Sequence, residues 1–341
     1  MIFTILICCF QIVSCTDDSN PAVSNSNNTD WLINQQSVFN GAPRDGIPSI
    51  DDPKFTPALE VDFLEDDALI MGIQIGEDIR AYPHPILDWH EIVNDRLGGV
   101  SLAVTYCPLT GTGIAWERVI DGRETTFGVS GLLFNSNLMP YDRETNSIWS
   151  QQRLDCVNGD QIGTEAVNYS LLETNWKTWR EAYPESDVLN TNTSFSRDYQ
   201  LYPYGDFRTN DSRLLFPVDT QDGRLPGKQR VLGVLANDEA KAYPWQDVEG
   251  PQLVRDNIAG QDIVVVRDRT REYIVAFEVT PSMNVELVDN EFPVILKDTD
   301  GNQYDILGYS EQTETVLQKP VQFMGYWFSW GTFYPGLEIV D

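Results

Sequence analysis

The sequence predicts an α+β fold that is mainly β and contains two copies of one unit. One observation is an internal repeat, because residues 70–117 align with residues 231–278 without a gap, at an offset of 231 − 70 = 161. A second is that both segments alternate short apolar runs with turn residues, which is typical of strands. A third is that two copies are too few for a solenoid, whose core needs several stacked repeats. We therefore expect the two copies to pack together in one compact body.

The aligned copies share residues that shape the backbone or fill a core. The identical positions of the first copy are Gly72, Ala81, Tyr82, Pro83, Asp95, Gly99, Ala115 and Glu117, and those of the second are Gly233, Ala242, Tyr243, Pro244, Asp256, Gly260, Ala276 and Glu278. Because these residues occur twice, their simplest explanation is the fold rather than a functional site.

Each copy is expected to form two strands, a helix and two more strands. In the first copy, LIMGIQI is followed by a turn and a short strand that ends at Tyr82-Pro83. Residues 85–95 then have helical spacing, with Ile86, Trp89 and Val93 on one face. The closing strands are VSLAVTYC and GTGIAWERV in the first copy, and QDIVVVRD and REYIVAFEV in the second.

Two further elements lie outside the repeat. Residues 170–186 predict a short helix, with Thr174 or Asn175 as the cap and Pro184 as the stop. The aromatic-rich residues 323–336 are expected to form a buried closing segment.

The N-terminal residues predict export and lipid anchoring. Residues 1–15 are an apolar run of signal-peptide length, and their ending, Ile-Val-Ser-Cys, resembles a bacterial lipobox in which Cys15 becomes lipidated. The absence of Lys and Arg from this run leaves a plain signal peptide or a misassigned start codon as alternatives. Residues 16–44 are expected to be a flexible polar tether, and residues 45–341 a single duplicated domain. We thus expect a lipid-anchored protein on the periplasmic or surface face of a bacterial cell envelope.

The charge of the chain restricts its partners. Lys and Arg number 23 against 52 Asp and Glu, which gives a net charge of −29. A strongly acidic protein is repelled by phosphate backbones and anionic lipid surfaces, so we exclude nucleic acid and expect membrane contact through the lipid anchor alone.

Cysteines are the first candidate reactive groups. With residues 1–15 set aside, the domain retains only Cys107 and Cys156. Cys107 ends a predicted strand, before the turn CPLTG, and the amides of that turn are expected to lower its pKa. Thr110 occupies the second position of a Cys-x-x-Cys spacing, which leaves Cys156 as either a resolving thiol or the partner in a structural disulfide.

The chain has 2 histidines, His84 and His90, and both lie in the first copy. His90 is the preferred partner of Cys107, because it lies within the predicted helix whereas His84 stands between two prolines. A soft metal such as copper would find Cys107, His90 and Met139 as ligands, whereas a structural zinc would lack four suitable ligands. Glu91 and Arg143 are lower-ranked candidates for the same site.

The chain resembles a bacterial and archaeal family called domain of unknown function 3179, from Asp45 to Pro335. The resemblance is carried by the segments DGIPSIDDPKF, RAYPHPILDWHEIVND, GGVSLAVTYCPLTGTGIAWER, FGVSGLLFNSNLMPYDRETNSIWSQ, TWREAYPESDVLN, RLPGKQRVLGVLANDEAKAYP and YWFSWGTFYP. Members often have Cys-Pro-Leu-Cys at the place of CPLT, and some are named as possible selenoproteins. The resemblance therefore implies redox chemistry around Cys107, while Thr110 departs from a dithiol pattern.

These observations lead to one functional hypothesis and two rivals. The hypothesis is a thiol-dependent oxidoreductase in which Cys107 reacts and His90 is its base, with an unidentified small-molecule or envelope redox partner. The first rival is a non-catalytic binding module with a structural Cys107–Cys156 disulfide. The second rival is a copper-binding electron-transfer protein, so that the sequence leaves the cofactor open between copper and none.

Overall fold

The computed structural model describes residues 31–313 and 315–341. The predicted signal peptide and the lipidation of Cys15 lie outside these residues. Strands dominate the described chain, and its α-helices are three short ones: α1 (His84–His90), α2 (Trp176–Ala182) and α3 (Trp327–Phe333). The predicted α+β class with mainly β structure is confirmed.

Two sheets have the same arrangement at their centres. The first sheet has the order β15 (Leu172–Asn175), β3 (Leu69–Ile75), β4 (Asp78–Pro83), β16 (Asp187–Leu189) and β2 (Phe55–Pro57). The second sheet has the order β25 (Val321–Tyr326), β17 (Arg230–Ala236), β18 (Glu239–Pro244) and β26 (Glu338–Ile339). The central pairs have one register, since Gly72 lies opposite Ala81 and Gly233 opposite Ala242. In both sheets the strand beyond the central pair, β16 or β26, runs parallel to its neighbour.

A second pair of sheets also corresponds between the segments of residues 70–117 and 231–278. One has the order β14 (Asn168–Tyr169), β7 (Thr112–Glu117), β6 (Val100–Cys107) and β5 (Ile92–Leu97), and the other has β19 (Pro251–Ile258), β20 (Gln261–Asp268) and β21 (Tyr273–Glu278). Asp95 pairs with Leu102 in the first, and Asp256 pairs with Ile263 in the second. Each of these aspartates accepts a hydrogen bond from a tyrosine hydroxyl, Tyr82 or Tyr243.

The predicted helix differs from the structure in both segments. In the first, α1 ends at His90 because Glu91 has a φ of 57°, and Val93 lies on β5 instead of on the helix. In the second, residues 245–250 form a turn. The observed order is therefore β-β-α-β-β-β in the first segment, with β5 as an additional strand, and five strands without a helix in the second, so the predicted β-β-α-β-β order holds for neither. Gly250 has a φ of 68° and precedes Pro251, and both features disfavour a helix there.

The remaining strands form three smaller groups. One sheet contains β1 (Val38–Asn40), β10 (Phe127–Phe134), β11 (Asn137–Asp142), β12 (Ile148–Ser150) and β13 (Asp155–Asn158). Another contains β22 (Glu286–Leu287), β23 (Val294–Lys297) and β24 (Gln303–Asp305). The third is a hairpin of β8 (Val119–Ile120) and β9 (Arg123–Glu124). Strand β1 corrects the predicted tether, because Val38 pairs with Phe134. The apolar side chains of Trp31, Ile33 and Val38 pack against a buried cluster, which explains why residues 31–44 are part of the fold.

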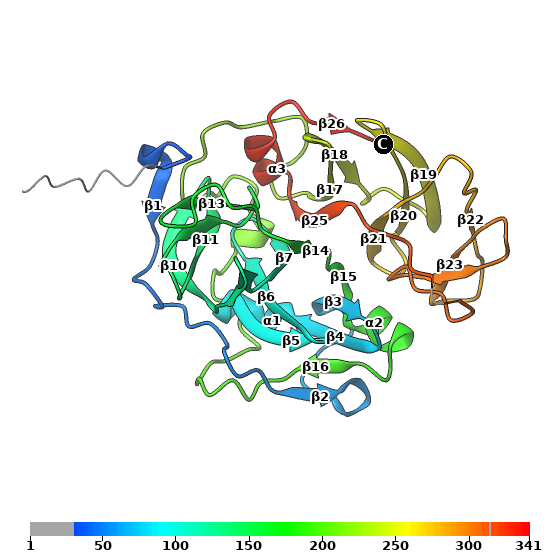
Figure 1. Ribbon diagram of the computed structural model, residues 1–341, viewed down its shortest axis with the longest axis horizontal. Coiled ribbons are helices and arrows are strands. Elements are labelled where there is room, and N and C mark those ends of the chain that lie inside the picture. The colour runs from blue at the N-terminus through cyan, green and yellow to red at the C-terminus, as the bar shows by residue number, and fades with distance from the viewer. Residues whose placement is uncertain (1–30, 314) are drawn as a thin grey trace, which may run out of the picture. The chain divides into compact units, whose positions relative to one another are not determined.

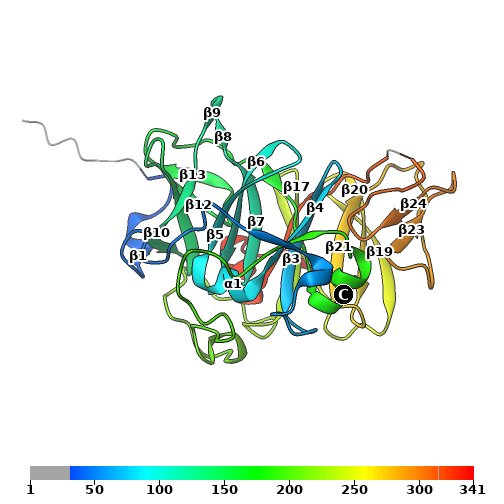
Figure 2. The same ribbon diagram turned by 90° about the horizontal axis from the view of Figure 1, so that it is seen from below.

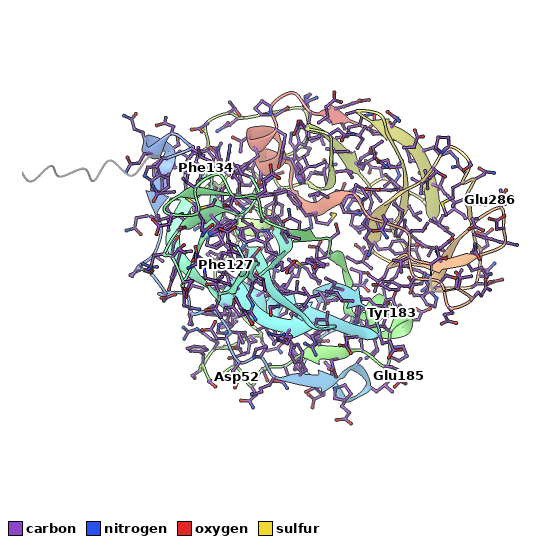
Figure 3. All side chains as sticks on the ribbon, in the orientation of Figure 1. Asp52, Phe127, Phe134, Tyr183, Glu185 and Glu286 are labelled. Atoms are coloured by element: carbon purple, nitrogen blue, oxygen red, sulfur yellow. The ribbon has the colours of Figure 1, made fainter. Side chains whose placement is uncertain are left out.

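Helix α2 and the segment after β25 follow their predictions. The side chain of Asn175 caps α2 by accepting a hydrogen bond from the amide of Thr178 (2.8 Å). The aromatic closing segment forms the end of β25 and then α3, whose Trp327 and Trp330 are fully buried. The end of α2 is also fixed to a strand distant in sequence, because the hydroxyl of Tyr183, a residue labelled in Figure 3, donates to Asp305 at the end of β24 (2.9 Å).

The two largest cores each combine parts of both segments. One core joins Ile70 and Trp179 to Val264 of β20, and the other joins Trp116 of β7 to Val231 of β17. Strand β25 accordingly contacts β7, and β15 contacts β21, as Figures 1 and 2 allow the reader to follow. We call this arrangement, in which the sheet of residues 69–83 packs on β20–β21 and the sheet of residues 230–244 packs on β6–β7, the interleaved core.

None of the helices in the described chain has the length and apolar character that a membrane span requires.

Candidate functional site

Cys107 lies where the sequence predicts it, at the end of β6 and before a tight turn. Its carbonyl oxygen accepts hydrogen bonds from the amides of Thr110 (3.3 Å) and Gly111 (2.8 Å). Gly111 has a φ of 65°, and a Cβ there would lie 2.9 Å from a guanidinium nitrogen of Arg230. A glycine is therefore required for the turn to close against Arg230.

The side chain of Cys107 is only 1% exposed, and its surroundings do not favour the thiolate. Burial, and then the nearby charge of Glu91, raises its pKa to about 11, although hydrogen bonds from Thr110 and the amide of Leu138 act in the opposite direction. The prediction that the turn amides lower this pKa was wrong, because desolvation of the thiolate outweighs them. At neutral pH Cys107 is a protonated thiol that needs a base.

His90 is not that base. Its Nδ1 lies 2.7 Å from the carbonyl oxygen of Pro48, and its Nε2 lies 2.7 Å from the hydroxyl of Tyr199. The ring is fully buried, and burial lowers its pKa. Both ring nitrogens are thus engaged in holding loops to α1, and these contacts give the predicted pairing of His90 with Cys107 no support.

The predicted copper ligands are not brought together. Met139 is fully buried in an apolar cluster with Phe134 and Val157, while both nitrogens of His90 already have partners. Among residues 31–313 and 315–341, no group of three His, Cys, Asp or Glu side chains is placed to hold a metal ion.

Cys156 does not pair with Cys107. In the described chain both cysteines are free and buried. The Cys156 thiol lies on β13 and donates to the carbonyl oxygens of Ile148 and Asn158, each at 3.4 Å. The predicted disulfide is therefore absent, and a resolving role for Cys156 has no support from the geometry.

Two lower-ranked candidates have structural positions. Arg143 binds Asp51 (3.2 Å) and donates to the hydroxyl of Ser49 (2.9 Å), which fastens the N-terminal segment to the β10–β11 hairpin. Thr110 is fully buried, and its hydroxyl accepts a hydrogen bond from the amide of Asn137 (2.9 Å). Arg143 lies outside the site, whereas Thr110 supports the turn that carries Cys107.

Lys228, a residue that sequence reasoning missed, is a basic side chain whose charge interacts with that of Cys107. Its Nζ is buried, has no hydrogen-bond partner among the described residues, and lies 3.1 Å from the centre of the Phe207 ring. Burial lowers the pKa of Lys228 to about 7, against the attraction of Asp211 and of Cys107. About half of the amine is therefore neutral at pH 7, so Lys228 can accept a proton.

Two carboxyl groups complete the surroundings of Cys107. Burial raises the pKa of Asp88 to about 7, and burial together with the charge of Asp88 raises that of Glu91 to about 7. Oδ1 of Asp88 lacks a hydrogen-bond partner within the described part of the chain, whereas Glu91 accepts a hydrogen bond from the Tyr204 hydroxyl (3.2 Å). Glu91 also has a left-handed backbone with a φ of 57°, and such strain is common at functional sites.

A buried ion pair between Arg230 and Glu173 supports the turn that follows Cys107. Arg230 donates to both carboxylate oxygens of Glu173 and to the carbonyl oxygen of Gly111 (3.2 Å). Burial opposes the ionisation of Glu173, but the charge of Arg230 outweighs it and lowers the pKa of this carboxyl. Nε2 of His84 lies 3.3 Å from the same carboxylate, so the histidine ranked second by the sequence is the one nearer to this site.

The site is covered by residues 190–229, which we call the covering segment. Within this segment, all of which is described, the only helix or strand is a short 3-10 helix, η3 (Phe207–Thr209). It supplies Tyr202, Tyr204 and Lys228 to the neighbourhood of Cys107. Long segments of this kind within a folded domain are often functional.

Some signals in the sequence point to the missed groups. Asp88 and Glu91 flank His90 in a segment that is otherwise largely apolar, and acidic residues at buried positions are rare unless they have a role. Lys228 stands in the segment RLPGKQRVLG, but 121 residues separate it from Cys107 (228 − 107 = 121), and nothing in the sequence indicates that the two meet.

Comparison with known proteins adds a family but no activity. A family model described as a protein of unknown function, DUF3179, matches residues 44–337. Neither the curated proteins nor the solved structures gave a match. The match covers most of the chain and contains every residue of the site around Cys107, so the chain belongs to the DUF3179 family.

Proposed function

We propose that this protein is a thiol-dependent oxidoreductase in which Cys107 reacts and Lys228 is its base. The observation that carries the proposal is the buried Nζ of Lys228, which has no hydrogen-bond partner in the described chain and interacts with the charge of Cys107. Because burial raises the pKa of the thiol and lowers that of the amine, both groups are neutral at rest, and the amine takes the thiol proton as the sulfur attacks the substrate.

The proposed substrate class is hydroperoxides, because a lone thiol reduces them without a second cysteine. The thiol proton of Cys107 moves to Nζ of Lys228, and the thiolate attacks the outer oxygen of the hydroperoxide. A sulfur–oxygen bond forms, the oxygen–oxygen bond breaks, and the leaving alkoxide takes the proton of the Glu91 carboxyl. Sulfur loses two electrons and the peroxide gains two, so the products are a sulfenic acid and an alcohol.

The cycle closes with an external thiol. One thiol condenses with the sulfenic acid of Cys107 to give a mixed disulfide and water, and a second releases Cys107 with formation of an external disulfide. The ammonium of Lys228 returns a proton to Glu91 through solvent, which restores both groups. Cys156 takes no part, because neither its hydrogen bonds nor its charge interactions involve Cys107 or Lys228.

The proposal is tested by exposing the purified reduced protein to tert-butyl hydroperoxide and trapping sulfenic acid with dimedone. We expect one adduct on Cys107, no adduct in Cys107→Ser, and an unchanged yield in the matched control Cys156→Ser. Wild-type turnover with dithiothreitol should give a bell-shaped pH profile near pH 7, because Lys228 must be neutral and Glu91 protonated. Lys228→Met should lower the rate about 100-fold and remove the acidic limb of the profile. A Cys107 that stays reduced in the folded protein, yet reacts after unfolding, would overturn the proposal.

We further propose that the protein is a lipoprotein of the cell envelope. Support comes from the lipobox-like ending at Cys15 and from the polar run that follows it. Expression with a radiolabelled fatty acid should label the wild type and not Cys15→Ala, while the matched control Cys9→Ala keeps its label. Label that persists in Cys15→Ala would show that the anchor has been assigned wrongly.

A further inference from the structure

A small pocket lies beside the candidate site and has not been used in the mechanism. Its volume is about 70 Å³, and it is partly open to solvent. Its walls are glycine, alanine and branched aliphatic side chains of residues 41–47 and of β10–β11, together with the ring of Phe216. Glu91 and Tyr204 are the polar side chains among the residues that line it.

The pocket reaches the surroundings of Cys107. Of its lining residues, Leu109 belongs to the turn that follows Cys107, and the amide of Leu138 interacts with the thiol. Glu91 raises the pKa of Cys107 through its charge, and Tyr204 both interacts with the charge of Cys107 and donates to Glu91. Four of the residues that surround the thiol are thus walls of the same pocket.

A reagent has to pass through a pocket to reach this sulfur, because only 1% of Cys107 is exposed. A cavity needs roughly 10–15 Å³ of this kind of volume for each water-sized group, so 70 Å³ accepts about five such groups. The lining includes no cationic side chain, and Glu91 repels an anion whenever it is ionised. The chemistry that fits is a short, uncharged aliphatic chain.

We propose that this pocket is the entrance to Cys107 and that it selects substrates with a short, uncharged aliphatic group. Combined with the proposed function, on which this reading of the substrate rests, the preferred class is short-chain alkyl hydroperoxides. The alkyl group would lie against Leu132 and Phe216, and the hydroperoxide would point toward Glu91 and Cys107. Removal of the chain from water supplies the selectivity, as each buried methylene strengthens binding about fourfold.

The test uses alkyl methanethiosulfonates, which probe access to the thiol whether or not the protein reduces peroxides. The thiolate attacks the outer sulfur, a disulfide forms, and methanesulfinate leaves. Modification of Cys107 is followed by intact mass in the Cys156→Ser protein, with propyl methanethiosulfonate compared to its anionic sulfonatoethyl analogue. We expect the propyl reagent to react at least ten times faster than the analogue, after correction for their rates with a free thiol.

A pair of variants locates the selectivity. Leu132→Phe places a larger side chain in the pocket and should reduce the propyl preference at least tenfold. Leu215→Phe is the matched control, since Leu215 is exposed beside Phe216 and does not line the pocket, and it should leave the preference unchanged. Equal rates for both reagents, or a preference that survives Leu132→Phe, would overturn the pocket as the entrance. A propyl preference without any peroxide reduction would support the pocket and refute only the proposed redox function.

Discussion

Gly72→Ala and Gly233→Ala are each expected to destabilise the protein by about 3 kcal/mol, the upper range for overpacking a core. A Cβ at Gly72 would lie 1.9 Å from a ring carbon of Trp179, and one at Gly233 would lie 2.0 Å from a ring carbon of Trp330. Both indoles are fully buried, and that of Trp179 is also held by a hydrogen bond to Ser186 (2.9 Å). Neither ring can move away without opening one of the two large cores.

Urea denaturation of the purified variants measures this loss. The matched control is Gly223→Ala, because no described atom lies within 4 Å of a Cβ at Gly223, and its effect should be within about 0.5 kcal/mol. If Gly72→Ala unfolds at the urea concentration of the wild type, the packing of α2 against β3 is not as described.

Asp88→Asn is expected to make the stability of the protein less dependent on pH. Burial raises the pKa of Asp88 to about 7, so between about pH 4 and pH 7 the folded protein keeps a proton that the unfolded chain has lost. The folded state then binds more protons, and stability falls as the pH rises through this window. Asparagine has no proton to lose, so this part of the fall disappears.

The comparison is made by urea denaturation at pH 5.5 and pH 8. The free energy of unfolding of Asp88→Asn, taken relative to that of the wild type, should be roughly 2 kcal/mol higher at pH 8 than at pH 5.5, since each unit of pKa shift corresponds to about 1.4 kcal/mol. The exposed Asp67→Asn serves as the control and should follow the wild type. A difference between Asp88→Asn and wild type that is the same at both pH values would show that Asp88 does not titrate between pH 5.5 and pH 8 in the folded protein.

The sequence predicts the strands and caps well because these depend on neighbouring residues. Alternating apolar runs mark β3, β6 and β20, and an asparagine before a tryptophan-rich run marks the start of α2. The length of α1 was predicted wrongly, since Val93 fits a helical stripe in sequence yet pairs with Val104 on β6. The sequence of this segment is compatible with either a helix or a strand, and its pairing with β6 makes it a strand.

The chemistry of the site depends on contacts that the sequence does not contain. His90 lies in the helix where the sequence predicts it, but Tyr199 and Pro48, which lie far from it in the chain, occupy its nitrogens. The sign of the pKa shift of Cys107 was also wrong, because local amides are visible in the sequence whereas burial is not. Lys228 was missed for the same reason, as its position is fixed by the aromatic rings of Phe207 and Phe328.

The interleaved core has a consequence for the order in which the molecule becomes complete. Glu173 precedes the covering segment, whereas Lys228 lies near its end and Arg230 follows it. Cys107 therefore gains the amine of Lys228 and the supporting Arg230–Glu173 ion pair only after the chain on both sides of that segment has been synthesised. A chain that stops before β17 lacks the sheet on which β6 and β7 pack and the ring of Phe328 that holds Lys228, so the base of the proposed mechanism is not in position. The late strands thus complete the surroundings of Cys107: in the proposed mechanism, a growing chain carries an unreactive thiol, and this thiol gains its base when the last sheet docks.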